Sequence, residues 1–144
     1  MGYFGIGIEN PKRECNIGTL WRSAYAFGAA FIFTIGGRYR NQSSDTTKSW
    51  RHIPLIRFET LEQFLTTLPY SCQLVGVEYG IGACELAKYE HAERVIYLLG
   101  AEDGGLSKDA MNACKALVSI PSRYCLNVAT AGSIVMYDRA VRMK

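Results

Sequence analysis

Three short stretches combine glycines or other small residues with polar side chains in a way that suits ligand binding. The first is "GAEDGGLSK", residues 100–108, which follows a strongly apolar segment. Its glycines let the backbone turn sharply and come close to a ligand. Glu102 and Asp103 would repel a phosphate, so the loop favours a ligand with hydroxyl, amine or sulfonium groups. A plain turn, in which Ser107 caps the next helix, explains the same composition equally well.

The second stretch is "IPSRYCLNVATAG", residues 120–132. Cys125 to Asn127 precede an expected helix whose first turns carry almost no bulk. Helix N-termini present free N–H groups, and small side chains let these groups reach a flat aromatic ligand such as an adenine. Close packing against a neighbouring backbone or a second subunit is an equally good explanation.

The third stretch is "NIGTLWR", residues 16–22. We expect Asn16 to cap a helix and Gly18 to keep its first turn open. Arg22 then projects from the helix roughly a turn and a half further along. An arginine outside the apolar stripe of a helix is usually a solvated surface residue, and composition alone favours that interpretation here.

Positive charge is concentrated in residues 36–52, "GGRYRNQSSDTTKSWRH". The segment has four cations against Asp45, a net of +3 (four minus one), which equals the formal charge of the whole chain. The cations are Arg38, Arg40, Lys48 and Arg51, and Tyr39 and Trp50 are interleaved with them. Cations hold phosphates and exposed aromatic rings stack on unpaired bases, so this composition predicts RNA binding. A soluble loop with ordinary charges is the alternative, although loops this long tend to be functional or mobile.

The elements that must position these stretches alternate between strand and helix. The apolar patterns predict strands at 3–9, 29–35, 55–58, 73–77, 94–99 and 116–120, and helices at 16–27, 61–68, 83–88, 108–115 and 127–142. Such alternation is typical of an α/β fold with a mainly parallel sheet flanked by helices on both faces. Ligands of these sheets bind beyond the carboxyl ends of the strands, where all three stretches lie. No repeat or boundary divides the chain, so we expect one domain over 1–144.

Several other classes of protein are disfavoured. The five cysteines contain no C-x-x-C pair and the two histidines lie far from any cysteine, so we expect no metal site and a reduced, cytoplasmic setting. His52 and His91 lie in segments expected at the surface, and without a G-x-S-x-G turn they do not support a hydrolase. The sequence has neither a P-loop nor the G-x-G-x-x-G of a Rossmann NAD enzyme. Its apolar runs are too short to span a bilayer, and its first residues do not form a secretion signal.

In order and spacing, "NIGTLWR", "LLGAEDGGLS" and "IPSRYCLNVATAG" resemble motifs 1, 2 and 3 of the SpoU/TrmH-like group of SPOUT RNA methyltransferases. The resemblance extends over essentially the whole chain, and "TTKSWRHIPL" also resembles a segment of these enzymes. It implies the SPOUT fold with a C-terminal trefoil knot, S-adenosyl-L-methionine as methyl donor, and a homodimer. It also implies methylation of a ribose 2′-hydroxyl in tRNA or rRNA. We favour tRNA for a chain of this size, in which we expect no appended RNA-binding domain.

The resemblance also implies roles for single residues. Asn16, Arg22, Glu102 and Asn127 take the catalytic positions, and the motif 1 arginine would assist deprotonation of the 2′-hydroxyl or bind the adjacent phosphate. The cofactor positions are Val77, Glu78, Gly100, Glu102, Gly105, Ile120, Cys125, Leu126, Asn127 and Ala129. The RNA-binding positions are Arg22, Arg38, Arg40, Lys48, Trp50 and Arg51.

One departure from the family pattern is Cys125, which stands where these enzymes usually have serine, and a thiol is a poorer hydrogen-bond partner than a hydroxyl. A catalytically silent SPOUT-fold RNA-binding module is the alternative function. The intact motif residues speak against it.

The resemblance offers a reason for the small residues after Asn127. A segment threaded through a knot passes close to neighbouring backbones and must leave a slot for adenosine. Bulk at Ala129, Ala131 or Gly132 would obstruct one or the other. The closing helix carries more apolar surface than a short helix needs, at Ile134, Val135 and Tyr137, and we expect it to form the dimer contact.

Overall fold

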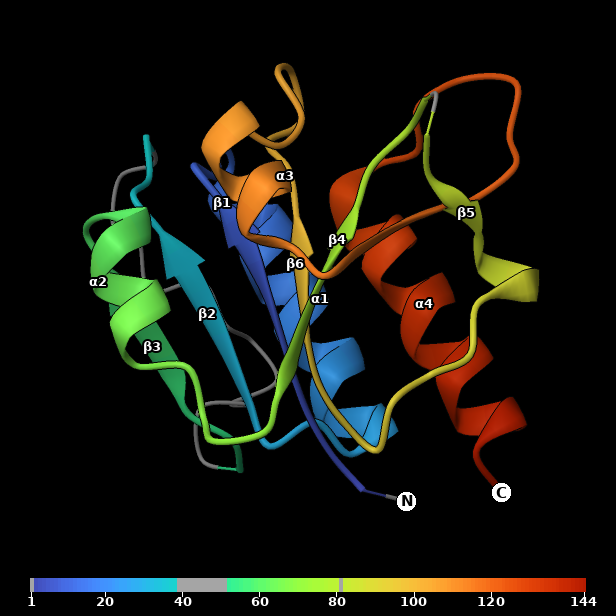
Figure 1. Cartoon of the computed structure of the whole chain (residues 1–144). Coiled ribbons are helices and arrows are strands. Elements are labelled where there is room, and N and C mark those ends of the chain that lie inside the picture. Colours follow the sequence, from blue (N-terminus) through green and yellow to red (C-terminus); the bar gives the residue numbers. More distant parts are fainter. Residues whose placement is uncertain (1, 39–51, 81) are drawn as a thin grey trace.

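The computed structural model describes residues 2–38, 52–80 and 82–144 (Figure 1). In chain order the elements are β1 (Tyr3–Glu9), α1 (Glu14–Phe27), β2 (Phe31–Ile35), β3 (Leu55–Phe58), α2 (Leu61–Thr66), β4 (Gln73–Val77), β5 (Cys84–Glu85), the 3₁₀ helix η2 (Leu86–Lys88), β6 (Arg94–Leu99), α3 (Lys108–Ala113), β7 (Ala116–Ser119) and α4 (Val128–Arg142).

The strands of the described residues form one seven-stranded sheet in the order β3-β2-β1-β6-β4-β7-β5. Every neighbouring pair in it is parallel, with Ile6 of β1 beside Ile32 of β2 and Tyr97 of β6. The predicted α/β class with a mainly parallel sheet is therefore confirmed. The knot implied by the resemblance stays a prediction.

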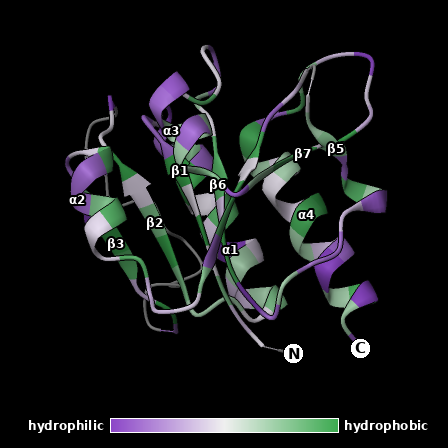
Figure 2. Ribbon diagram, in the orientation of Figure 1, coloured by the Kyte–Doolittle hydropathy of each residue, from purple (hydrophilic) through white to green (hydrophobic). Residues whose placement is uncertain are grey.

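Helices cover both faces of the sheet, so its central strands are buried on two sides (Figures 1 and 2). Alternate residues of each strand point to opposite faces. Ile6 and Tyr97 belong to the core under α1 and α4, whereas Phe33 and Leu98 belong to the core under α2 and α3. This two-sided burial explains why the strands read as continuous apolar runs in the sequence.

The prediction of a helix at 83–88 is wrong. Cys84 and Glu85 form the edge strand β5, which pairs with Val118 and Ser119, and only the 3₁₀ turn η2 follows. The guanidinium of Arg142 donates a hydrogen bond to the carbonyl oxygen of Leu86, 3.0 Å away. A helix of so few residues is marginal by itself, so tertiary pairing decides the conformation.

His91 was expected in a surface segment, and that expectation is wrong for its side chain, which is 1% exposed. Its Nδ1 lies 2.6 Å from the hydroxyl of Tyr97, and its Nε2 lies 2.7 Å from Oδ2 of Asp138 on α4. These contacts come from distant parts of the chain, so no local pattern marks them. The ring helps to join α4 to β6.

Helix α4 packs closely on α1 and the sheet because Gly132 has no side chain. A Cβ at this position would lie 2.5 Å from Cδ1 of Leu20 and 3.0 Å from Cδ1 of Leu99. Val135, expected at a dimer contact, is instead fully buried in the chain's own core. Tyr137 and Val141 are the exposed apolar side chains of this helix.

Within the described part of the chain, no helix combines the length and apolar character needed to cross a bilayer. The same residues contain no group of three or more His, Cys, Asp or Glu side chains arranged to hold a metal ion.

Candidate active site

A cavity of about 280 Å³ opens at the carboxyl ends of β4, β6 and β7. Its walls come from the loop after β4 beginning at Val77, the loop after β6 from Leu99 to Gly105, and the segment between β7 and α4. Val128 and Ala131 in the first turns of α4 close the remaining side. The three stretches of chemical interest thus meet at one edge of the sheet, with the first turn of α1 beside them.

The loop after β6 folds tightly on itself, and its glycines are required for that fold. Ala101 and Gly105 form an antiparallel bridge, and Gly105 has a φ of +67°. A Cβ on Gly100 would lie 2.3 Å from the backbone of Gly105, and one on Gly105 would lie 2.6 Å from Oε2 of Glu78. The glycines expected to admit a ligand therefore first allow close packing within the loop itself.

Two carboxylates from other strands fix this loop. Glu78 accepts hydrogen bonds from the backbone N–H groups of Leu106 (2.7 Å) and Tyr79 (2.9 Å). Glu9, buried at the end of β1, accepts bonds of 2.7 Å from both the N–H and the hydroxyl of Ser107. Ser107 also caps α3, as expected, by accepting from the N–H of Ala110. Sequence reasoning missed Glu9, although a carboxylate that ends an apolar strand was a usable signal.

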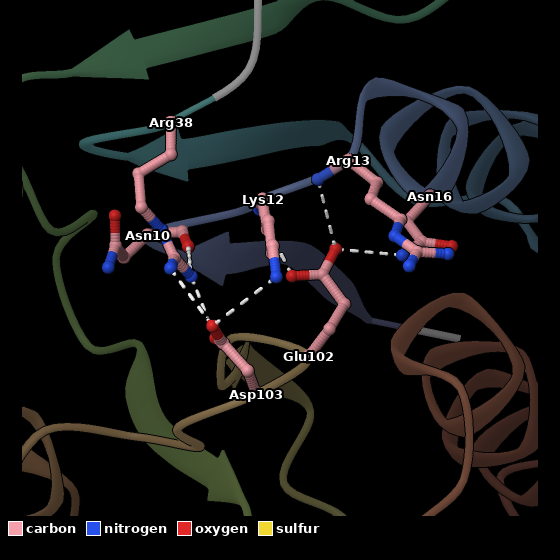
Figure 3. A network of polar contacts seen from close by, with 7 residues as sticks. All are labelled: Asn10, Lys12, Arg13, Asn16, Arg38, Glu102 and Asp103. Carbon is pink, nitrogen blue, oxygen red and sulfur yellow. Dashed lines mark hydrogen bonds and ion pairs between the residues drawn. The ribbon is translucent and has the colours of Figure 1, made fainter.

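A chain of hydrogen bonds joins Asn127, Asn16 and Glu102 (Figure 3 shows the Glu102 end). Asn127 Nδ2 donates to Asn16 Oδ1 (2.9 Å), and Asn16 Nδ2 donates to Glu102 Oε1 (2.7 Å). The Glu102 carboxylate also accepts from the N–H groups of Lys12 (3.0 Å) and Arg13 (3.4 Å). Partial burial by itself raises the pKa of Glu102, but these hydrogen bonds outweigh it and hold the pKa below its usual value.

The expectation that Asn16 caps α1 is wrong. The helix begins two residues earlier at Glu14, and Arg13 occupies the cap position without a side-chain hydrogen bond. Asn16 is buried in the first turn, where its amide bonds other elements instead. Asn127 does act as a cap, because its Oδ1 accepts from two backbone N–H groups at the start of α4.

Asp103 forms a second polar group beside this chain (Figure 3). Its carboxylate accepts two hydrogen bonds from the Arg38 guanidinium, at 2.8 and 3.0 Å, and lies 3.8 Å from Nζ of Lys12. Arg38 also donates to the carbonyl oxygen of Asn10 (3.3 Å). The paired guanidinium lowers the pKa of Asp103 to about 2.

The structure brings most of the predicted cofactor residues to the cavity. Those lining it are Val77, Glu78, Gly100, Glu102, Gly105, Ile120, Cys125 and Leu126. Asn127 and Ala129 do not line it: the first bonds Asn16, and the second is buried in the first turn of α4.

Sequence reasoning did not assign Tyr79 and Ser122 to the site, where the Tyr79 hydroxyl donates to the carbonyl oxygen of Ser122 (3.3 Å). An aromatic residue two positions after a strand end is too common to signal this.

Arg22 is not brought to the cavity within one chain. The buried residues of α1 include Asn16, Leu20 and Ala24, and Arg22 lies on the opposite, exposed side of the helix. It has no hydrogen-bond or ion-pair partner within the ranges that the structure describes. Of the predicted RNA contacts, Arg40, Lys48, Trp50 and Arg51 lie outside the described residues.

Residues 4–137 match the model of the SpoU rRNA Methylase family. The chain belongs to this family. The match covers the three motifs together with the strands that carry them, so the resemblance drawn from the motifs is confirmed.

Known proteins of this kind are similar along the whole chain. A 23S rRNA (uridine(2479)-2′-O)-methyltransferase from Streptomyces viridochromogenes is 28% identical over 99% of this chain and 53% of its own length. The AdoMet-bound rRNA methyltransferase from Sinorhizobium meliloti has a TM-score of 0.87 at 26% identity, over 99% of this chain and 57% of that one. This chain therefore spans about half the length of the curated relatives it matches.

A second solved structure, described as giving insights into the 2-OH methylation of C/U34 on tRNA, has a TM-score of 0.85. It is 21% identical, and the match covers 99% of both chains. This likeness shows that the two chains share a fold.

Proposed function

We propose that this chain binds S-adenosylmethionine in the cavity at the strand ends and transfers its methyl group to a ribose 2′-hydroxyl of RNA. The observation that carries the proposal is the hydrogen-bonded chain Asn127–Asn16–Glu102 beside that cavity, in a member of the SpoU family. The related proteins described above are named as RNA methyltransferases, and one was crystallised with AdoMet.

The residues of the cavity fit such a ligand. Its volume of about 280 Å³ is near the lower end of small-molecule sites, roughly 300–1,000 Å³. Leu99, Ile120, Leu126 and Val128 supply apolar walls for a flat base, and the loop 100–105 supplies backbone groups. The carboxylate of Glu102 suits a cationic sulfonium better than an anion, whereas that of Asp103 is already paired with Arg38 and Lys12. Cys125 lines the wall, where its backbone is available whatever its side chain does.

The bound cofactor would supply an electrophilic methyl group, and the protein's share is to place the ribose oxygen behind it and lower the cost of losing its proton. Glu102 is a poor base for that proton, because its pKa is lowered and both its oxygens already accept hydrogen bonds. We assign Glu102, Asn16 and Asn127 to positioning: they hold the loop after β6, the start of α1 and the start of α4 in one arrangement.

Stabilising the developing alkoxide then requires a cation, and Arg22 is the candidate from motif 1. Because Arg22 faces away from its own sheet, we propose that it acts at the cavity of a second copy in a homodimer. The exposed Tyr137 of α4 packs against Phe27 of α1, and Val141 is exposed on the same helix. These residues give α1 and α4 a partly apolar outer surface for a second copy.

The test is methyl transfer from labelled S-adenosylmethionine to unfractionated tRNA and to purified rRNA, followed by mapping of 2′-O-methylated positions. We expect labelling that depends on the cavity, with tRNA ahead of rRNA; the Streptomyces relative makes rRNA the second candidate. Cofactor and RNA binding without transfer to either RNA would favour the silent binding module instead.

A further inference from the structure

We propose that Arg38 and Lys12 form a binding site for an RNA phosphate, and that Asp103 occupies this site in the free protein as a stand-in for the phosphate. The proposal rests on the proposed function, because it concerns the RNA strand that enters the same cavity.

The geometry of the Arg38–Asp103 pair supports the proposal. Both guanidinium Nη atoms donate to the two carboxylate oxygens, at 3.0 and 2.8 Å. This two-pronged arrangement is the one by which arginine recognises either a carboxylate or a phosphate. Lys12 Nζ lies 3.8 Å from the same carboxylate. One anion is thus held by two cations.

The pair is placed where a phosphate of the substrate would arrive. Asp103 lines the cavity, and Lys12 and Arg38, in the segments that follow β1 and β2, reach the Asp103 carboxylate (Figure 3). A ribose whose 2′-hydroxyl enters the cavity brings its own flanking phosphates to this rim. The Arg38 backbone N–H donates to the carbonyl oxygen of Pro11 (2.9 Å), and its side chain also donates to that of Asn10. The arginine therefore stays in position whichever anion it holds.

A phosphate can also replace the Asp103 carboxylate in this pair at little cost in stability. The side chains of Arg38 and Asp103 are 41% and 47% exposed, and ion pairs in such solvent contact contribute little net stability. A phosphate would take the place of the carboxylate without desolvating a buried charge. Asp103 thus competes with other anions for the two cations. Weakly bound anions do not displace it, whereas the phosphate of a correctly positioned RNA strand does.

The experiment measures RNA binding by Asp103→Asn, which keeps the size of the side chain and removes its charge. The probes are unfractionated tRNA and purified rRNA, titrated at several salt concentrations. We expect the Kd of Asp103→Asn for the RNA that wild type methylates to fall about three- to tenfold, and the slope of log K against log salt to steepen by about one, because Arg38 then releases a counterion on binding. The affinity for S-adenosylmethionine is measured with the same variants.

Glu85→Gln is the matched control, because it likewise neutralises an acid that pairs with one exposed cation, Lys88 at 3.1 Å, away from the cavity. It should leave the Kd and the salt slope unchanged. Arg38→Ala should weaken binding, and in the double variant with Asp103→Asn the gain should vanish, as expected for residues that share one ligand.

The contrary outcomes are distinct. A gain in Glu85→Gln equal to that in Asp103→Asn, or a gain that survives without Arg38, would reduce the effect to overall charge and overturn the site. Weaker S-adenosylmethionine binding without tighter RNA binding would make Asp103 a support of the loop, which also overturns it. If wild type methylates RNA and either result appears, only this inference fails. If wild type neither binds nor methylates RNA, the proposed function fails with it.

Discussion

The Nδ2 group of Asn127 donates a hydrogen bond to Oδ1 of Asn16, 2.9 Å away, although 111 positions separate the two residues in the chain. The bond has only one workable direction. Oδ1 of Asn127 is occupied by the N–H groups that it caps at the start of α4, and Nδ2 of Asn16 is occupied by Glu102. Donors therefore point from α4 through α1 to the loop after β6. Each member fixes the orientation of the next.

The first prediction separates the two roles of Asn127. Asn127→Ser keeps an acceptor for the helix cap but loses the amide that donates to Asn16, whereas Asn127→Ala loses both. We expect Ala to reduce the free energy of unfolding by about 1 kcal/mol more than Ser does, the usual value of a cap. Both should lower methyl transfer by about tenfold or more, measured at saturating cofactor. Full activity in the Ser variant would leave Asn127 with the cap alone.

The second prediction concerns Glu102. The Glu102 carboxylate accepts hydrogen bonds from N–H groups through both of its oxygens. In Glu102→Gln the amide NH₂ replaces one of these oxygens and faces an N–H donor, so at least one hydrogen bond is lost. We expect destabilisation of about 1–2 kcal/mol, as for a partly buried unpaired donor, and a loss of methyl transfer that raising the pH does not restore. Denaturant unfolding and initial rates measure the two effects. Glu90→Gln, at an exposed position in the segment between η2 and β6, is the control and should match wild type in both.

The sequence predicted the sheet and the placement of the loops, because buried parallel strands leave a local pattern of apolar residues. The segments at 3–9 and 94–99 were predicted at their observed bounds as β1 and β6. Contacts between distant residues left no such pattern. The bonds from Ser107 to Glu9, and from Arg38 to Asp103, join residues 98 and 65 positions apart. Asn16 was read as a cap for the same reason, since only the folded chain supplies its partners.

The third prediction compares two neighbouring residues of α4. A Cβ on Gly132 would meet the ends of the Leu20, Leu99 and Ile6 side chains, which can shift. Gly132→Ala should therefore change stability by less than about 1 kcal/mol, because better helix propensity offsets the crowding. Gly132→Leu should destabilise by about 1–3 kcal/mol through overpacking.

Ala131 borders the cavity instead, so Ala131→Leu should remain folded and bind S-adenosylmethionine at least about tenfold more weakly, about 1.4 kcal/mol by the affinity relation. Thermal unfolding and calorimetry distinguish the two sites. Equal cofactor affinity in Ala131→Leu and wild type would contradict the placement of the cofactor.

The fourth prediction is a pH dependence of stability from His91. Burial of the ring lowers the pKa of His91, and the hydrogen bond with Asp138 opposes this only in part. The nearby guanidinium groups of Arg142 and Arg139 also lower it. A neutral ring satisfies both contacts, with Nε2–H donating to Asp138 and Nδ1 accepting from the Tyr97 hydroxyl.

The His91 ring binds a second proton more readily in the unfolded chain than in the folded one. The contribution of the neutral ring to the free energy of unfolding is therefore complete above about pH 6.5, the pKa of histidine in the unfolded chain. It is lost as the pH falls below that value toward the lowered folded pKa. We expect the free energy of unfolding in urea to fall between pH 7.5 and 5.0, and to fall less in His91→Gln. Both proteins carry His52, so the difference between their slopes reports on position 91. Identical slopes for the two proteins would show that His91 does not control this dependence.

The last prediction tests whether Arg22 acts between subunits. The Arg22→Ala variant should keep its cavity and its affinity for the cofactor. Its rate of methyl transfer in single-turnover assays should fall by about a hundredfold or more. Arg22→Lys should recover only part, because it retains the charge without the planar fork. As an exposed residue of α1, Arg22 should contribute less than about half a kcal/mol to stability. Near-equal rates for wild type and both variants would remove Arg22 from the mechanism.

Mixing two inactive variants decides where Arg22 acts. Arg22→Ala retains an intact cavity, whereas Ala131→Leu retains Arg22 beside a blocked cavity. If Arg22 completes the site of its partner, a mixed dimer has one site with both intact parts. Co-expression at equal levels should then restore about a quarter of wild-type activity, since about half of two-fold dimers are mixed and one of their two sites works. If Arg22 serves its own cavity, neither subunit of the mixed dimer is complete and activity stays at the level of the separate variants. Restoration without a dimer in sedimentation experiments would contradict the shared site as well.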